Sequence, residues 1–396
     1  MTADPLAPDA AMLEITESPL AAAPADWDEL VGPGGADFYS SRAWHLAMAG
    51  LNGAEERLVV ARGRDGALRA VVPVFHFASG PANPLLHPGT LFGCANATVD
   101  PAARQWEPVT VVGNASGYST APATSDDLSS WAVAASRVAA EGTAVVPYLT
   151  GDVVSRLRDL WPDKPMVLTS LRVVVPVPGT SIDEYYAAIP RRRRELVRRE
   201  RRLLTDGERA ITMEEMTDAN ITDLARLQEN TQRRHGSFGD AGYFERLYQR
   251  MSSALRGVVF ALVCRHEGRA LGFLWAVVHG KTLVARSIGL DYERVGRYAE
   301  YFNLMIHEPV RYCLAHGLGE IDMSVGSYQQ KLLRGGRPVL AWSVLLRPPP
   351  QWTAHDTELH NRKRARQLLA EAGRLAPAEI ADQLRCVAAS GRAQLS

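Results

Sequence analysis

One segment in the second half of the chain combines side chains that bind anions or move protons. Its polar members, in chain order, are Asp322, Ser324, Ser327, Tyr328, Gln329, Gln330, Lys331 and Arg334. A strand is expected to bring Asp322 and Ser324 to its end, Gly326 permits a turn, and a short helix presents Tyr328 and Lys331. Only four of the 44 basic residues are lysines, so this lysine is a candidate for point-charge binding or proton handling. A capped surface helix is the alternative interpretation.

A predicted strand–loop–helix occupies residues 282–317, with its loop at 291–296. A strand that ends in a loop and opens a helix presents free backbone N–H groups and the positive end of a dipole, which together bind phosphate. In this loop Arg294 and Arg297 flank Gly296. The pattern therefore favours a donor-phosphate site, although an ordinary helix start with solvated arginines has the same appearance.

A strongly basic helix is predicted from Arg191 to Arg202. These residues contain eight arginines against two glutamates, which gives a local charge of +6. Apolar residues recur at helical spacing, so the helix can dock on a core and display arginine on its remaining face. A phosphate-rich partner such as RNA, or a donor that carries a nucleotide, is one interpretation. A solvated amphipathic helix is the other.

His235 lies at a predicted helix end, before a glycine-rich loop. Its ordinary pKa near neutrality makes it a candidate general base. An exposed loop histidine without a catalytic role is the alternative.

The composition excludes several classes of protein. Basic and acidic residues balance at 44 each, which argues against a dedicated nucleic-acid coat or a polybasic membrane anchor but not against a local patch. The four cysteines are far apart, so neither a zinc site nor a disulfide framework is predicted, and no metal is expected. Signatures of nicotinamide enzymes, P-loop enzymes, zinc proteases and α/β-hydrolases do not occur.

The ends and apolar stretches of the chain predict a cytoplasmic protein. The N-terminal residues lack the basic and apolar regions of a secretory signal. The longest apolar stretches, such as 271–278, are too short to span a bilayer. No membrane partner is expected, and the oligomeric state stays open.

The elements that must position these residues follow a similar order in both halves. The first half is expected to hold a helix near 44–51, strands at 57–61, 68–77, 109–112 and 144–149, and a helix at 126–141. The second half is expected to hold helices at 243–251, 298–316 and 328–333, and strands at 258–264, 270–278, 282–288, 320–324 and 339–346. Aligning Gly66 with Gly268 superposes helix, strand, turn and strand, which favours tandem duplication. Two unrelated α/β halves that share a common hairpin are the alternative.

A chain of 396 residues predicts two domains of ordinary size. The expected organisation is a flexible segment at 1–30, α/β domains at 31–178 and 179–350, and a helical tail at 351–396.

These residues, in this order, resemble the GCN5-related N-acetyltransferase (GNAT) superfamily. More narrowly, they resemble its tandem, Fem-like branch of peptidoglycan- or cellulose-biosynthesis type. The motifs that carry the resemblance are the approach from Tyr185 to Pro190, Thr231-x-x-Arg234, Tyr243-Phe244-x-x-Leu247, the strand–helix at 282–317, and Gly326-x-x-x-x-Lys331-x-x-Arg334-Gly335-x-x-Pro338. The resemblance implies an α/β fold of two GNAT-like domains, each a twisted mixed sheet flanked by helices, with the donor site in the second.

The resemblance also implies a reaction. A deprotonated amine attacks the carbonyl of a thioester, or of aminoacyl-tRNA in Fem-type members, while backbone N–H groups of a splayed strand polarise that carbonyl. The donor loop of the superfamily is [QR]-x-x-G-x-[GA]. Here Tyr298 stands where glycine or alanine is expected, and this departure puts a coenzyme A donor in doubt.

The residues and the resemblance together predict a site. Catalytic roles are expected for Tyr328, Lys331, Asp322 and His235. Donor binding is expected for Ile288, Arg294, Gly296, Arg297 and Tyr298, and substrate binding for Thr231, Arg234, Arg286, Ser324 and Gly326.

Three functions follow as hypotheses. The first is an N-acyltransferase that moves an acyl group from acyl-CoA, or from a carrier-bound thioester, to an amine of a small molecule or peptide. The second is a transferase that uses aminoacyl-tRNA and holds the RNA through Arg191 to Arg202. The third is a non-catalytic binding protein that retains the fold.

Overall fold

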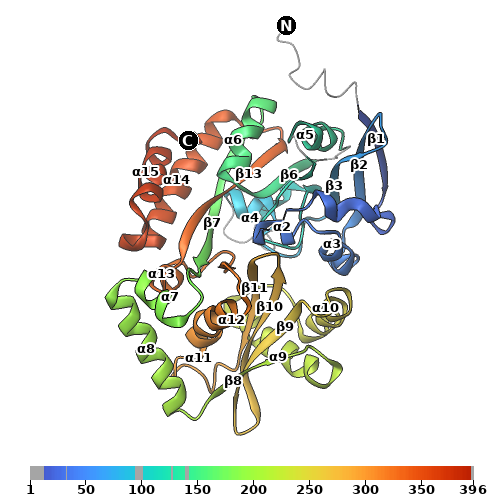
Figure 1. Ribbon diagram of the computed structural model, residues 1–396. Helices are drawn as coiled ribbons and strands as arrows, with labels where there is room; N and C mark the ends of the chain where they lie inside the picture. The colour runs from blue at the N-terminus through green and yellow to red at the C-terminus, as the bar shows by residue number, and fades with distance from the viewer. Residues whose placement is uncertain (1–12, 33, 94–100, 126–127, 139–141, 394–396) are drawn as a thin grey trace. The chain divides into compact units, whose positions relative to one another are not determined.

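The computed structural model describes residues 13–32, 34–93, 101–125, 128–138 and 142–393, and they divide into two compact units (Figure 1). Unit 1 contains the described residues of 1–32, 36–172 and 339–396. Unit 2 contains residues 173–338 together with 34–35. Each unit is a mixed sheet with helices packed on it, so the predicted α/β fold class is confirmed.

Unit 1 is built on strands in the spatial order β1-β2-β3-β4-β6-β13. Their bounds are β1 Leu13–Pro19, β2 Glu55–Gly63, β3 Leu68–Phe77, β4 Val109–Val112, β6 Thr143–Thr150 and β13 Arg337–Arg347, with β5 Ala123–Thr124 beside β3. β4 and β6 run parallel, and the other neighbouring pairs are antiparallel. The valine-rich runs of β3, β4 and β6 are buried along almost their whole length, which is the environment that β-branched side chains favour.

Helices and an aromatic core complete unit 1. The helices are α2 Gly35–Phe38, α3 Arg42–Met48, α4 Pro88–Phe92, α5 Leu128–Ser136, α6 Gly151–Leu160, α14 Ala354–Ala372 and α15 Ala378–Ser390, with 3-10 turns η1 Leu20–Ala22, η2 Ala25–Leu30, η3 Pro101–Trp106 and η5 Gly373–Leu375. Trp27, Phe75 and Trp106 are fully buried in the core. Asn361 fixes α14 to the sheet, because its side chain accepts from Leu168 N (2.7 Å) and donates to Met166 O (3.1 Å).

Unit 2 is built on strands in the spatial order β8-β9-β10-β11-β12-β7, and β7 belongs to this unit only from Val173 onward. Their bounds are β7 Met166–Pro176, β8 Ala210–Glu214, β9 Val259–His266, β10 Arg269–His279, β11 Thr282–Leu290 and β12 Glu320–Asp322. β11 and β12 run parallel, and the other pairs are antiparallel.

The helices of unit 2 lie on both sides of its sheet. They are α7 Ile182–Ala188, α8 Arg191–Asp206, α9 Asp218–His235, α10 Ala241–Ala254, α11 Glu300–Phe302, the π-helical turn η4 Asn303–His307, α12 Glu308–His316 and α13 Tyr328–Leu333. α9 and α10 cover one side of β9–β11, and the run from α11 to α12 covers the other (Figure 1). Gly289 of β11 permits the close approach of α9, because a Cβ there would lie 2.7 Å from Gln228 N.

The two sheets repeat one topology. In each, an edge strand and a β-hairpin lead to an antiparallel strand, then to a parallel neighbour, then to a final antiparallel strand. The hairpin turns match as well, with positive φ at Gly66 (78°) and Gly268 (77°). This agreement over six strands favours tandem duplication beyond the hairpin that the sequence suggested.

The structure divides the chain differently from the expected linear order. The divisions fall after Arg172 and after Pro338, and residues 339–396 return to unit 1 instead of closing the second domain and forming a separate tail. Residues 13–30, expected to be flexible, form β1, η1 and η2, and β1 pairs with β2 from Leu13↔Gly63 to Pro19↔Arg57. Residues 1–12, Cys94 and both ends of the helix expected at 126–141 lie outside the described residues.

The helix that follows β11 differs from the prediction at its start. The helix expected at 298–316 begins at Glu300 and is π-helical at Asn303–His307. In the described part of the chain, no helix is both long and apolar enough to cross a membrane.

Candidate active site

A constrained turn joins β12 to α13 and carries most of the predicted catalytic residues. Ser324, Gly326 and Ser327 have φ of 58°, 77° and 51°. A serine in this left-handed region costs about 1 kcal/mol or more, so the surrounding contacts must hold the turn in place. Asp322 is fully buried, and its Oδ1 accepts from Ser324 N at 2.9 Å.

Lys331 provides the strongest of these contacts. Its Nζ donates to Met323 O at 2.6 Å and to Val325 O at 2.8 Å. The ammonium therefore bridges the end of β12 and the turn, and the side chain is only 3% exposed. Burial lowers the pKa of Lys331 to about 7, and the charge of Asp322 opposes only part of that shift. Tyr328, on the first turn of α13, is also buried.

β11 and β12 separate just before this turn. Their parallel pairing covers only Thr282–Val284 against Glu320–Asp322, whereas β11 stays paired with β10 as far as Leu290. Arg286 is the extra residue of a bulge, because Trp275 pairs with Ser287 and Ala276 with Ala285. Residues 286–288 are half-buried, between buried residues on both sides. A β11 edge without a neighbouring strand in the described residues thus lies beside Asp322, and it includes Ile288 and Arg286.

A buried ionic cluster anchors α8 to α13 and to the π-helical turn. Arg334 donates through Nε to Glu200 Oε2 at 3.0 Å and through Nη2 to Glu200 Oε1. His307 Nε2 lies 2.7 Å from Glu200 Oε2, and Asn303 Nδ2 donates to Glu200 O at 3.0 Å. All four side chains are buried, so Arg334 holds α8 rather than facing a ligand.

Within the cluster, Arg334 and His307 stabilise the negative charge of Glu200. Burial would raise the pKa of Glu200, but hydrogen bonds from His307 and Arg334 outweigh it and hold that pKa below its ordinary value. Burial lowers the pKa of His307, opposed in part by Glu200. The sequence held one signal of this cluster: Glu200 lies on the same helical face as Val197 and Leu204, and a charged residue on an apolar face requires a buried partner.

The predicted donor loop follows β11 and is closed on itself. Gly296 N and Tyr298 N donate to Glu300 Oε2 at 3.0 and 3.1 Å. Arg209 Nε donates to Glu300 Oε1 at 2.8 Å, and Glu300 is fully buried. Glu300 and Arg209 are not among the residues predicted from the sequence; an acidic residue in the first helical turn is a capping signal that could have identified Glu300.

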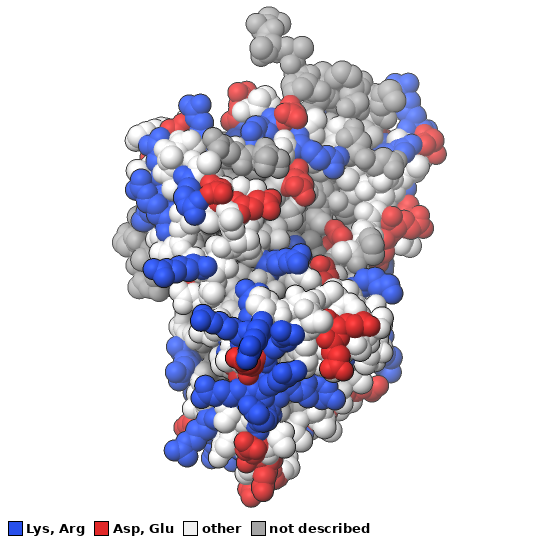
Figure 2. All heavy atoms as spheres, turned by 60° about the vertical axis from the view of Figure 1, so that its left-hand side comes forward, with Lys and Arg blue, Asp and Glu red and all other residues white. Residues whose placement is uncertain are grey.

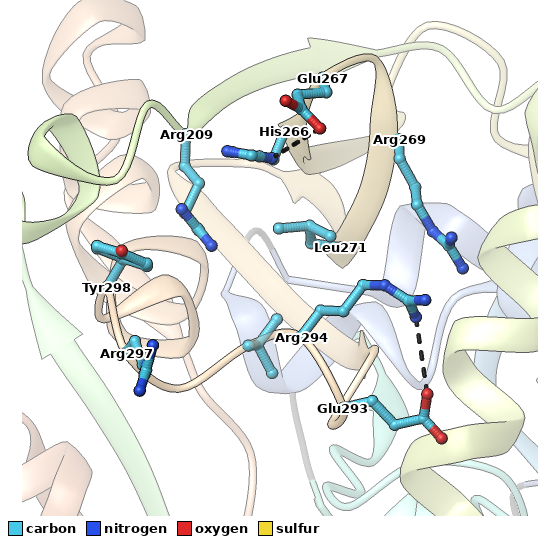
Figure 3. A pocket seen from close by; sticks show the side chains of 10 residues that line it. Arg209, His266, Glu267, Arg269, Leu271, Glu293, Arg294, Arg297 and Tyr298 are labelled. Atoms are coloured by element: carbon cyan, nitrogen blue, oxygen red, sulfur yellow. Dashed lines mark ion pairs between the residues drawn. The ribbon is translucent and has the colours of Figure 1, made fainter.

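A cavity of about 720 Å³ lies beside this loop. Figure 3 shows Arg209 and Tyr298 on one side of it and Arg269, Arg294 and Glu293 on the other. Arg294 pairs with Asp291 (2.8 Å) and Glu293 (3.7 Å). The Tyr298 ring lies flat under the Arg209 guanidinium, 3.8 Å from its Cζ. Arg297 also lines the cavity and is exposed.

The remaining predicted residues form a separate group at the end of α9. Thr231 is buried, and its Oγ1 accepts from Leu290 N at 3.0 Å, which ties α9 to the end of β11. Arg234 lies over the Tyr292 ring at 4.3 Å. His235 is exposed, with Nε2 3.4 Å from the Tyr292 hydroxyl. His235 and Arg234 thus contact the donor loop, whereas Asp322, Tyr328 and Lys331 are brought together at the β12–α13 turn.

The basic face of α8 is a strongly positive surface of unit 2. Five of its arginines are exposed: Arg191, Arg192, Arg198, Arg199 and Arg202. Glu195 pairs with Arg191 at 2.9 Å, and Glu200 is committed to the buried cluster. Figure 2 shows Lys and Arg side chains gathered over this helix with few acidic groups among them.

Part of unit 2 matches a known protein family. Residues 190–332 match the family model of the acetyltransferase (GNAT) domain, so unit 2 carries a GNAT domain. The resemblance to the GNAT superfamily is confirmed for these residues. No curated protein gives a significant match.

Solved structures share the fold over both units. FemX matches at 13% identity with a TM-score of 0.54, over 84% of this chain and 96% of its own. L-PGS from Bacillus licheniformis matches at 9% identity with a TM-score of 0.52, over 84% and 93%. A conserved protein of unknown function from Bacteroides thetaiotaomicron matches at 11% identity with a TM-score of 0.51, over 85% and 100%. These matches confirm the Fem-like likeness as a likeness of fold.

Proposed function

We propose that the protein is an N-acyltransferase that forms an amide by direct attack of an amine on an activated acyl group. The observation that carries the proposal is the separation of β11 from β12, within a GNAT domain, beside a turn braced by Lys331. In this proposal, backbone N–H groups on the side of β11 from which β12 has separated donate to the oxygen of an acyl carbonyl. Such donors contribute most where negative charge develops in the transition state.

The turn residues take complementary roles in this proposal. Lys331 positions the turn through Met323 O and Val325 O. Tyr328 and Ser324 lie at its two ends, and we assign them to contact the reacting atoms, while Asp322 accepts from Ser324 N. His235 contacts Tyr292 of the donor loop instead, so we assign it no part in the chemistry at the turn.

Two donors remain candidates, and α8 favours one of them. An acyl-CoA or carrier-bound thioester would need a phosphate site, which the sequence placed at Arg294, Gly296 and Arg297. Aminoacyl-tRNA would instead use a long basic face, because each phosphate neutralised by arginine releases counterions and adds affinity. The exposed arginines of α8 form such a face, so aminoacyl-tRNA is the donor that we propose.

The test is transfer from a defined donor. Purified protein is incubated with a pool of tRNA charged with labelled amino acids, and with small amines and short peptides as acceptors. Labelled amide is then detected by mass spectrometry. We expect product that disappears when RNase is added first and that falls at least tenfold in Tyr328→Phe, because the hydroxyl contributes to the reaction. Product that survives RNase, with acyl-CoA as the effective donor, would overturn the tRNA assignment.

A further inference from the structure

The geometry points to Glu300 as an internal carboxylate that occupies the anion-binding position of the 291–299 loop. We infer that it excludes the pyrophosphate of a CoA-type donor from this loop. The inference deepens the proposed function and rests on it, because it concerns which donor the acyltransferase takes. The sequence alone suggested the opposite, a loop open to phosphate.

The backbone donors of the loop are already engaged. Gly296 N and Tyr298 N converge on one oxygen of Glu300 at 3.0 and 3.1 Å. Two N–H groups that converge on one anionic oxygen are the arrangement by which such loops hold a phosphate. A phosphate that entered would have to displace a fully buried carboxylate from both of them.

The second oxygen of Glu300 is held from the opposite side. Arg209 Nε donates to Oε1 at 2.8 Å, and this guanidinium lies on the Tyr298 ring. Gly207 packs against the same ring, where a Cβ would lie 2.5 Å from Tyr298 Cδ1. Moving Glu300 would therefore leave the guanidinium of Arg209 without its carboxylate in a packed environment, which destabilises the displaced state.

The charges of the cavity are matched as well. Its arginines are Arg209, Arg269, Arg294 and Arg297. The carboxylates that line the cavity or pair with these arginines are Glu267, Glu293, Asp291 and Glu300. Four positive side chains are thus balanced by four negative ones, so the cavity offers no surplus charge to a pyrophosphate.

The experiment compares coenzyme A binding to the wild type, to Glu300→Ala and to Glu293→Ala. Binding is followed by calorimetry and by hydrogen exchange of peptides that cover the loop. We expect no change in loop exchange when coenzyme A is added to the wild type or to Glu293→Ala, whose carboxylate is exposed. Glu300→Ala frees two N–H groups and Arg209, and it should bind coenzyme A about 10- to 100-fold tighter than the wild type, the factor for one charge-assisted hydrogen bond.

Two outcomes would overturn the inference. One is slower exchange of the wild-type loop with coenzyme A, which would mean that the loop accepts the ligand with Glu300 in place. The other is a folded Glu300→Ala, verified by circular dichroism, that gains no affinity. If the variant does not fold, the wild-type exchange result decides alone. Failure of the proposed function would appear separately, as no amide from any donor while coenzyme A binding follows the expected pattern.

Discussion

Two groups of arginines in unit 2 look alike in the sequence and differ in the structure. Two arginines beside the donor loop form short ion pairs with carboxylates, Arg294 with Asp291 and Arg209 with Glu300. Five arginines of α8 are exposed, and apart from the buried Glu200 the helix has only Glu195 and Asp206 to balance them. The loop is therefore a neutral, closed structure, and the helix is a positive surface.

The role of a charged side chain in this domain therefore depends more on the group with which it pairs than on its residue type. In the sequence, Glu200 lowers the net positive charge of α8. In the structure, its carboxylate pairs with Arg334 and His307 in the interior of the unit. The displayed face of α8 is accordingly more positive than its composition states. The donor loop shows the opposite effect. Its sequence motif is basic, but Glu300, which follows the motif in the chain, offsets part of that positive charge.

The largest effect is expected from Glu200→Gln. Removing one partner of a buried ion pair leaves the other charge uncompensated and costs about 3–5 kcal/mol. Arg334 would be that charge, so we expect a loss of this size in the free energy of unfolding, measured by urea titration. The matched control on the same helix is Glu195→Gln. Its pair with Arg191 is exposed, and its loss should cost at most about 0.5 kcal/mol. Equal losses in both variants would contradict the role of Glu200 as the buried anchor.

Two triple variants test the contrast between the exposed arginines of α8 and the arginines beside the donor loop. Arg198→Ala, Arg199→Ala and Arg202→Ala together should weaken tRNA binding about 100-fold, a moderate figure for three charge-assisted contacts. They should also reduce the slope of log affinity against log salt by about 2–3. Arg269→Ala, Arg294→Ala and Arg297→Ala should change the affinity less than about threefold, because most of that charge is already matched within the loop. Filter binding over a salt series measures both. A larger effect from the loop variant would reverse the comparison.

Much of the fold was predictable because local patterns specify it. The strands at 68–77 and 109–112 and the helix at 328–333 match β3, β4 and α13 at both ends, since apolar runs and glycine turns mark them without tertiary help. β7 was missed although it is an apolar run. The return of residues 339–396 to unit 1 was not predictable, because strand pairing between distant segments leaves no local signal.

The candidate active site, like the fold, was predictable only where its residues are neighbours along the chain. Residue type and spacing predicted that Asp322, Ser324 and Lys331 lie at one turn, because a strand end, a turn and a short helix are adjacent along the chain. They could not show that Arg334 faces Glu200, or that Gly296 N faces Glu300. Those partners come from other elements or from a turn whose geometry had to be seen.

The last prediction contrasts the lysine of α13 with the arginines around it. Burial lowers the pKa of Lys331 from 10.5 to about 7 in the folded protein. Between these values the unfolded chain binds more protons than the folded one, so the free energy of unfolding rises with pH, by at most about 1.4 kcal/mol per pH unit. Below the lower value both states are protonated, and the full cost of burying the charge remains.

Lys331→Met removes this titration, and Lys331→Arg replaces it with a group that stays charged. Urea titrations from about pH 6 to about pH 9.5 should therefore show the stability of the wild type rising relative to both variants as the pH increases. A constant difference would mean that Met323 O and Val325 O keep the ammonium charged throughout. Lys331 would then act as a fixed point charge that braces the turn. A rising difference would show that its proton leaves near neutrality, which is what a group that exchanges protons with an attacking amine requires.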